Sequence, residues 1–197
     1  ELKAVARNKT RALALRALAH MGSPESLPAL RKAAEDPDPA VRDAAAAGLA
    51  RLGDSRALER LFFGLASEDP AQRTKAAQAL SEAGTPAVVE KLRPLADDDV
   101  YHVRAAVMEA LGASGSPLVL PELLKGADDQ NELVRSKAVA AMGALGQPAA
   151  AQYLEDARKK APNVYMELLA VAGLARLGEP IVNSAARRAL FQPDADT

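Results

Sequence analysis

The side chains that most often carry out catalysis or bind metals are scarce in this chain. Its 197 residues include no cysteine, which excludes thiolate nucleophiles, disulfides and Cys-bound zinc, and only two histidines. Neither His20 nor His102 is followed by an acidic residue or spaced as in an H-x-x-x-H motif. We therefore expect no metal ion and no cofactor. We interpret His20 as lying near a helix C-terminus, where an imidazolium interacts favourably with exposed carbonyl groups.

Carboxylates are plentiful, but their positions favour helix capping over catalysis. The clusters Asp97-Asp98-Asp99 and Asp128-Asp129 fall just before expected helix N-termini, where the helix dipole stabilises negative charge. Neither cluster has the alternating oxygen ligands and terminal Glu of a calcium-binding loop. No segment alternates in the manner of a β-strand, so no Gly-rich loop follows a strand as in a phosphate-binding motif. The sequence thus predicts an all-α protein that is not an enzyme.

Net charge and hydropathy disfavour two further classes of function. Lys and Arg total 25 and Asp and Glu total 26, so the net charge of −1 creates no field that attracts nucleic acid or an anionic membrane. No stretch approaches the roughly 18 apolar residues of a membrane-spanning helix, and the N-terminus lacks the apolar core of a secretory signal. Because the chain begins at Glu1 rather than Met, we expect an excised domain or a mature fragment. A cytoplasmic location is favoured, with a periplasmic one open if a signal peptide was removed.

Glycine recurs along the chain with a fixed period. The period is 31 residues, with one inserted position before its last member, and it is carried by Gly22, Gly53, Gly84, Gly115, Gly146 and Gly178. Such a period is typical of a solenoid, in which short units stack because none can bury its apolar face alone. We predict one α-solenoid domain over residues 1–197, made of about six helix hairpins. Their expected bounds are 8–36, 37–67, 68–98, 99–129, 130–161 and 162–191, followed by a frayed tail at 192–197.

The second unit shows why each repeat should form a hairpin. Pro39 suits the first turn of a helix, whose buried face then recurs at helical spacing as Val41, Ala45, Gly48, Leu49 and Leu52. Gly53 ends this helix, and Asp54 or Ser55 caps a second helix with a buried stripe of Leu58, Leu61 and Leu65. In all units the first helix also carries a small residue at one equivalent position, and these residues are Ala17, Gly48, Ala79, Ala110, Ala141 and Gly173. This column predicts that the hairpins pack closely around one continuous core.

A 31-residue hairpin with an Asp six positions before the Arg of a Val-Arg pair resembles the HEAT repeat, and in particular its short bacterial form, the phycobilin-lyase HEAT-like repeat. The signature appears as Asp36 with Val41-Arg42, Asp98 with Val103-Arg104, and Asp129 with Val134-Arg135. In that family the Asp and Arg side chains form a hydrogen-bonded ladder between successive repeats. The resemblance implies such a ladder here, starting at Arg11 and formed by Asp36, Arg42, Arg73, Asp98, Arg104, Asp129 and Arg135.

Two units depart from this pattern. Ser67 replaces the Asp before Arg73 and leaves a neutral rung that can still accept a hydrogen bond. In the sixth unit Met166-Glu167 stands in place of Val-Arg and Ala161 stands at the Asp position, so we expect the ladder to end before this repeat. Terminal repeats are atypical because one side faces solvent, and Glu167 is interpreted as part of a cap.

By the same resemblance, the second helices are expected to line the concave face and to contact a partner. Because leucines already fill the buried stripe of the second unit, at least one of Phe62 and Phe63 should be forced toward solvent. An exposed aromatic side chain rimmed by basic residues is typical of a protein-binding hot spot. We predict such a site at Phe62, Phe63, Arg93, Leu124, Lys125 and Tyr153. The alternative is that one Phe packs under the next hairpin and the other against its own helix.

We predict a non-catalytic scaffold or adaptor that binds another protein, or a second copy of itself, through this concave face. Two alternatives stay open. Some HEAT-like solenoids are DNA glycosylases with a basic groove, and the second helices here carry a basic strip that acidic residues interrupt, without interleaved aromatics. The family name also suggests a bilin lyase-type subunit, but few aromatic residues are available to hold a flat pigment.

Overall fold

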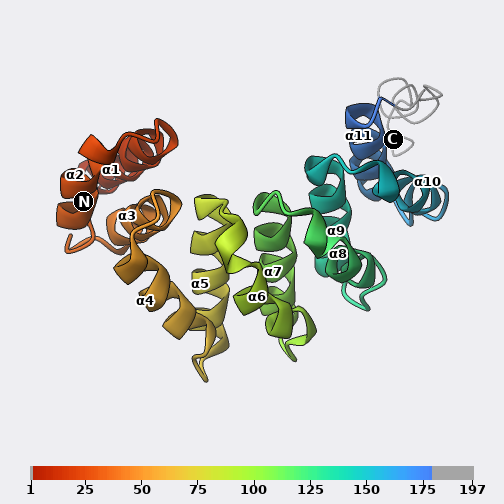
Figure 1. Cartoon of the computed structure of the whole chain (residues 1–197), viewed down its shortest axis with the longest axis horizontal. Coiled ribbons are helices and arrows are strands. Elements are labelled where there is room, and N and C mark those ends of the chain that lie inside the picture. Colours follow the sequence, from red (N-terminus) through yellow and green to blue (C-terminus); the bar gives the residue numbers. More distant parts are fainter. Residues whose placement is uncertain (1, 179–197) are drawn as a thin grey trace.

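The computed structural model describes residues 2–178, with side chains from Ala6 onward, as a curved stack of helix pairs (Figure 1). The first helices of the pairs are α1 (Leu2–His20), α3 (Pro39–Arg51), α5 (Pro70–Ala83), α7 (Tyr101–Ala113), α9 (Glu132–Leu145) and α11 (Val164–Arg176). The second helices are α2 (Leu27–Ala33), α4 (Ser55–Leu65), α6 (Val89–Leu92), α8 (Leu120–Ala127) and α10 (Ala151–Lys159). Residues 2–178 contain no strand, and the predicted all-α solenoid is confirmed.

The links between the two helices of a pair end one helix and start the next within a few residues. Gly84 follows α5 with φ 58° and Gly146 follows α9 with φ 65°, a left-handed conformation that costs glycine little. A side-chain oxygen then caps the following turn: the Asp54 carboxylate accepts from the Ala57 N–H at 3.1 Å and the Ser116 hydroxyl from the Leu118 N–H at 3.4 Å. Second helices other than α4 begin with one 3₁₀ turn at Pro24–Ser26, Pro86–Val88, Pro117–Val119 or Pro148–Ala150, and α6 continues into a 3₁₀ segment at Arg93–Asp97.

Small residues let the first helices approach one another closely. A Cβ atom added to Gly112 of α7 would lie 2.5 Å from the Ala141 Cβ atom of α9, and one added to Gly143 would lie 2.7 Å from the Gly173 Cα atom of α11. The backbones are therefore in direct contact at positions where the sequence predicts a small column. Each first helix packs along the next one, whereas the second helices touch each other far less.

This difference in packing decides which side of the stack is concave. In Figure 1 the first helices lie on the inner side of the arc and the second helices on its outer side. Arg16 of α1 and Glu82 of α5 form a two-pronged ion pair, with N–O distances of 2.8 and 2.9 Å, that spans the intervening helix α3. The prediction that second helices line the concave face is therefore wrong. Helices rich in Ala and Gly approach more closely than helices carrying Leu, so the stack curves toward them.

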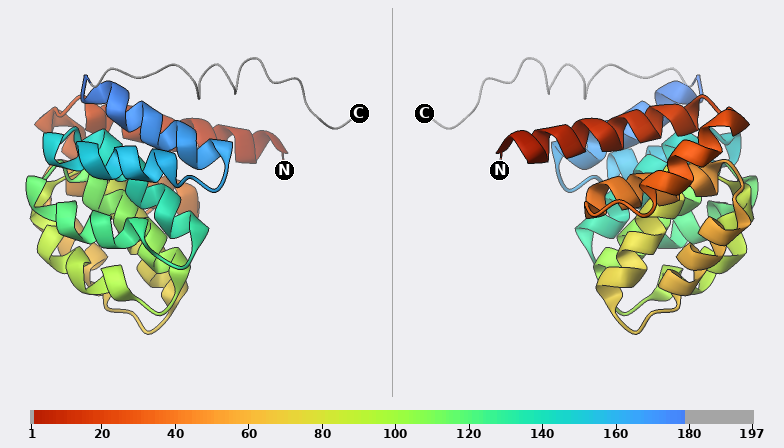
Figure 2. Two further views of the ribbon diagram at one scale, coloured as in Figure 1. Left: turned by 90° about the vertical axis from the view of Figure 1, so that its right-hand side faces the viewer. Right: turned by 90° about the vertical axis from the view of Figure 1, so that its left-hand side faces the viewer.

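The curvature is visible along the whole stack. Viewed along its long axis in Figure 2, α1 and α11 lie near one edge of the molecule and the middle hairpins near the opposite edge.

The buried residues form two clusters. The repeat pattern predicts one continuous core, and this prediction is wrong. The smaller cluster joins the first two hairpins around Leu30, Val41 and Leu49, and the larger one runs from Leu65 to Leu174. The break between the clusters separates α3 from α5 and passes through the second hairpin, because Leu65 near the end of α4 belongs to the larger cluster.

Two predictions concern residues outside 2–178. The second helix of the sixth repeat, expected within residues 162–191, falls mostly beyond the described residues, and so does the tail at 192–197. The first helix of that repeat is α11, and Asn163 caps it by accepting from the Met166 N–H at 2.9 Å.

Candidate functional site

Arginines at the start of successive first helices tie neighbouring hairpins together. Arg73 Nε and Nη2 donate to the two Asp98 carboxylate oxygens at 2.7 and 3.0 Å, and Arg104 pairs with Asp129 in the same way at 2.7 and 2.9 Å. Arg11 pairs with Asp36 at the start of the chain. Nη1 of each interior arginine also donates to two backbone carbonyls of the preceding link, as Arg104 does to Asp98 and Asp99 at 2.8 and 3.3 Å. Each arginine thus joins the links on both sides of its own first helix.

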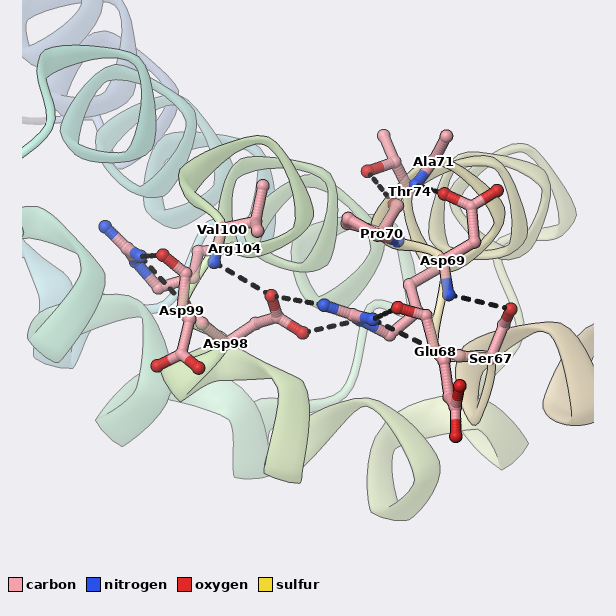
Figure 3. A network of polar contacts seen from close by, with 11 residues as sticks. Ser67, Glu68, Asp69, Pro70, Ala71, Thr74, Asp98, Asp99, Val100 and Arg104 are labelled. Atoms are coloured by element: carbon pink, nitrogen blue, oxygen red, sulfur yellow. Dashed lines mark hydrogen bonds and ion pairs between the residues drawn. The ribbon is translucent and has the colours of Figure 1, made fainter.

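The acidic partners also order their own links, as Figure 3 shows for Asp98. Asp98 Oδ1 accepts from the Val100 N–H at 2.9 Å, and Asp129 Oδ1 accepts from the Asn131 N–H at 2.8 Å. The hydrogen bonds from Arg104 lower the pKa of Asp129 against the opposing effect of burial. Burial raises the pKa of Asp98, but the hydrogen bonds from Arg73 and Val100 together outweigh it, so the net pKa is lowered. Both carboxyls are held ionised at neutral pH.

The ladder is interrupted between the second and third hairpins. Ser67 keeps one function of the missing Asp, since its hydroxyl accepts from the Asp69 N–H at 3.2 Å (Figure 3). A hydroxyl has no second oxygen to offer, and within residues 2–178 no side chain accepts from Arg42. Arg42 Nη1 still donates to the carbonyls of Asp36 and Pro37, both at 2.7 Å. The ladder also ends at Arg135, which donates to the carbonyls of Asp129 and Gln130 at 2.8 and 2.9 Å.

A groove of about 710 Å³ opens at the joint where this rung is missing. Its walls come mainly from α3, α4 and α5, with contributions from α1 and α2. Gln72 is exposed at the position where Val41, Val103 and Val134 are fully buried in other first helices. Ala79 is half-buried beside the groove, whereas Ala110 and Ala141 in the same column are buried. A polar side chain in place of Val thus leaves this joint incompletely packed.

Charged residues dominate the lining of the groove. Two ion pairs lie in it: Arg16 with Glu82, and Arg31 with Asp54 at 2.8 Å. The remaining charged side chains of the lining are exposed and have no ionic partner within the described residues: Arg42, Arg56, Arg60, Lys75, Glu35 and Asp43. Unpaired cations outnumber unpaired anions, so the groove favours a negatively charged occupant.

The six residues predicted to bind a partner all lie on second-helix segments, but they do not form one patch. Phe63 is 83% exposed on α4 and Tyr153 is 50% exposed on α10. These helices are separated along the arc by two other hairpins (Figure 1). Because the second helices lie on the outer side, this surface is not the concave face of the stack.

The other four predicted residues are engaged within the stack, and Arg93 and Lys125 bond across to the neighbouring hairpin. Phe62 and Leu124 are half-buried and pack against the larger core cluster, and the Lys91 ammonium lies 6.0 Å from the Phe62 ring centroid. Arg93 donates to Glu90, Glu122 and the Leu118 carbonyl, while Lys125 pairs with Asp97 at 2.6 Å. Replacing Phe62 and Leu124 by Asp would therefore disturb folding as well as any contact with a partner.

Sequence reasoning missed the groove although its signals are present. Gln72 and Ser67 depart from the repeat at the same joint, and Arg56 and Arg60 lie one helical turn apart on α4. Phe63 follows Arg56 and Arg60 at i+7 and i+3, so it lies on the same face of α4 as these two arginines of the groove.

Within the described residues, no group of acidic, His or Cys side chains could hold a metal ion, and no helix has the length and apolarity to cross a membrane.

Comparison with known proteins identifies the family. The model of HEAT repeats matches residues 2–62, 59–132 and 101–175. This chain belongs to the HEAT-repeat family. No curated protein matches this HEAT-repeat chain in sequence.

Solved structures agree on the fold of this HEAT-repeat protein. Human deoxyhypusine hydroxylase in complex with glycerol is similar with a TM-score of 0.53 and 22% identity, over 87% of this chain and 68% of that one. A designed armadillo repeat protein in complex with the peptide (KR)4 is similar with a TM-score of 0.53 and 20% identity, over 83% and 91%. The complex of CpcE and CpcF of phycocyanin lyase from Nostoc sp. PCC7120 is similar with a TM-score of 0.50 and 22% identity, over 91% and 86%. At these identities the likeness shows the fold alone.

Proposed function

We propose that this HEAT-repeat protein is a non-catalytic scaffold that binds a partner protein at the groove between its second and third hairpins. The observation that supports this most is the coincidence of a charged groove of about 710 Å³ with the interrupted rung of the ladder, beside the exposed Phe63. The proposed binding site differs from the six-residue site predicted from sequence, but Phe63 is one of those six residues and lies beside the groove.

The composition of this surface suits a protein partner. Arginine and aromatic side chains are enriched among residues that dominate binding energy, and both occur on one face of α4 as Arg56, Arg60 and Phe63. The groove is bounded by five helices, and small residues such as Ala46, Gly64 and Ala79 lie among the charged residues of its lining, so a main chain can approach there. A partner seated there would cover Phe63 and remove its apolar surface from water.

The solved structures support the choice of a binding role without deciding it. The designed armadillo repeat protein holds the peptide (KR)4, so a stack of this kind can accommodate an extended peptide. Deoxyhypusine hydroxylase and phycocyanin lyase show that the fold also occurs in enzymes. The proposal that this chain is not an enzyme rests on its own residues, which include no cysteine and only two isolated histidines.

A pull-down from the native organism tests the proposal. Wild-type protein and two single variants, Phe63→Asp and Tyr153→Asp, are immobilised, and retained proteins are identified by mass spectrometry. We expect one partner to be retained by wild type and by Tyr153→Asp but lost with Phe63→Asp, because both changes affect exposed side chains and only Phe63 lies beside the groove. Equal retention by all three proteins would contradict the proposal, as would a stoichiometric metal or pigment found by elemental analysis and visible absorption.

A further inference from the structure

We propose that the groove binds an acidic, extended segment of a partner protein, and that a side-chain carboxylate of this segment pairs with Arg42, where Ser67 replaces the Asp of the ladder. This inference rests on the proposed function and adds the chemistry of the partner. Its basis is the geometry of Arg42, the lining of the groove and the way in which this chain binds its own carboxylates.

Arg42 is oriented in the same way as the arginines that bind a carboxylate. In Arg73 and Arg104, Nη1 is bonded to two carbonyls of the preceding link, which leaves Nε and Nη2 to bind both oxygens of an Asp. Arg42 Nη1 makes the corresponding two carbonyl bonds at 2.7 Å, and its Nε and Nη2 have no hydrogen-bond partner within residues 2–178. A guanidinium edge held in this way matches a carboxylate and binds it with two parallel hydrogen bonds.

The groove extends this single contact to a segment. Arg42 itself lines it, together with Arg56, Arg60 and Lys75, which are exposed and unpaired within the described part of the chain. Repeated positive charge along an elongated surface complements a segment with several Asp or Glu residues. The small side chains between these cations allow the main chain of such a segment to approach.

An acidic peptide fits these residues better than a nucleic acid does. Glu35 and Asp43 lie among the cations and would repel a phosphodiester backbone, whereas a peptide can place neutral residues opposite them. No aromatic side chain among the described residues lines the groove itself, and the single exposed Phe63 beside it offers no row of stacking surfaces for successive bases. The two-pronged contact that we assign to Arg42 is one that this chain already makes to Asp98 and Asp129 through other arginines.

A peptide-binding measurement tests the inference on the whole chain. The probe is a fluorescein-labelled, amidated peptide of alternating Asp and Gly, and the comparison probes are its Asn counterpart, the Asn peptide with a free C-terminal carboxylate, and a single-stranded oligothymidylate. Fluorescence anisotropy gives the dissociation constant for wild type, Arg42→Gln, Ser67→Asp, Ser67→Asn and Arg135→Gln. Ser67→Asp puts a carboxylate of the chain itself on Arg42, while Ser67→Asn offers an acceptor without charge. Arg135→Gln removes the other ladder arginine that has no Asp partner within residues 2–178, and this arginine lies outside the groove.

We expect the Asp peptide to bind wild type, and both Arg42→Gln and Ser67→Asp to weaken it by about tenfold, the effect of losing a charged hydrogen-bonded pair. Ser67→Asn and Arg135→Gln should leave the constant within about twofold of wild type. Equal binding to all five proteins, no binding of the Asp peptide, or tighter binding of the oligothymidylate or of the free C-terminus would overturn the inference. Retained sensitivity of the natural partner to Phe63→Asp would then show that the proposed function stands without it.

Discussion

The joint between α7 and α9 and the joint between α3 and α5 are built from the same repeat but have opposite properties. At the first, Gly112 lies against Ala141, Val134 is fully buried and Arg104 binds Asp129. At the second, the corresponding valine is Gln72, the corresponding Asp is Ser67, and a groove remains. Two polar substitutions at one interface thus change a packed seam into a surface that a ligand can enter.

The comparison shows which features pack neighbouring hairpins of this solenoid tightly together. The small column brings backbones together, the buried Val fills the space beneath, and the Arg-Asp pair fastens the links at the edge. The α3–α5 joint keeps the small residues but lacks the other two features, and the core divides there into two clusters. Stability in a repeat protein is the sum of repeat and interface terms, so this joint is expected to be the weaker one.

The largest expected difference between the joints comes from equivalent leucines. Leu111 is fully buried within the larger cluster, so Leu111→Ala should lower the free energy of unfolding by about 2–5 kcal/mol. Leu49 lies at the same repeat position beside the groove, and the space left by Leu49→Ala can open to solvent, so its cost should fall near the lower limit of about 2 kcal/mol. Urea denaturation followed by circular dichroism measures both values. Equal losses of unfolding free energy would mean that the groove does not reduce the cost of the cavity left by Leu49→Ala.

Glycine-to-alanine substitutions should lower the stability of the two joints by different amounts. A Cβ atom at Gly112 would meet both the Cβ and the Cα atom of Ala141, at 2.5 and 2.9 Å, so Gly112→Ala must push two helix backbones apart. We expect it to destabilise by about 1–3 kcal/mol despite the better helix propensity of alanine. At Gly64, beside the groove, the new Cβ meets only the Ala76 Cβ at 3.0 Å. The Ala76 Cβ is attached to the α5 backbone, so α4 and α5 must shift by a few tenths of an ångström, and the gain in helix propensity offsets part of this cost. Gly64→Ala should therefore change the free energy of unfolding by less than about 1 kcal/mol, and thermal melting of both variants checks that Gly112→Ala is the more destabilising change.

Much of the fold follows from residues that act locally. The Gly period marks the ends of the first helices because each of them is followed by a glycine in the left-handed conformation, as at Gly84 and Gly146. The resemblance to HEAT repeats implied the Asp-Arg ladder, and the partners of Arg73 and Arg104 each lie 25 residues further along the chain. These features depend on one residue, or on two at a constant separation, and are readable without knowledge of the curvature.

The concave side and the groove were not predictable in the same way. Curvature depends on the difference between two sets of helix spacings, which accumulates over several hairpins, and no single residue encodes it. The groove needs two departures, Ser67 and Gln72, to act on one interface, and each of them alone has an ordinary structural explanation. Phe62 and Phe63 were singled out together from sequence, because at least one of them could not fit the buried stripe of α4. That Phe63 is the exposed one, and which residues surround it, depends on the packing of α3, α4 and α5.

The smallest expected effect is a loss of stability at acid pH, and it tests whether the Arg104–Asp129 ion pair stabilises the α7–α9 joint. The pKa of Asp129 is lowered in the folded protein, chiefly by the hydrogen bonds from Arg104, whereas an unfolded Asp titrates near pH 3.9. The stabilisation is therefore fully present above about pH 4 and is lost as the pH falls through the folded pKa. Asp129→Asn keeps an oxygen that can accept from the Asn131 N–H but removes the charge, so it should cost about 1 kcal/mol at neutral pH. Wild type and variant should converge in stability once the pH lies below the folded pKa of Asp129, and a difference that stays constant through the acid range would mean that the ion pair does not stabilise the joint.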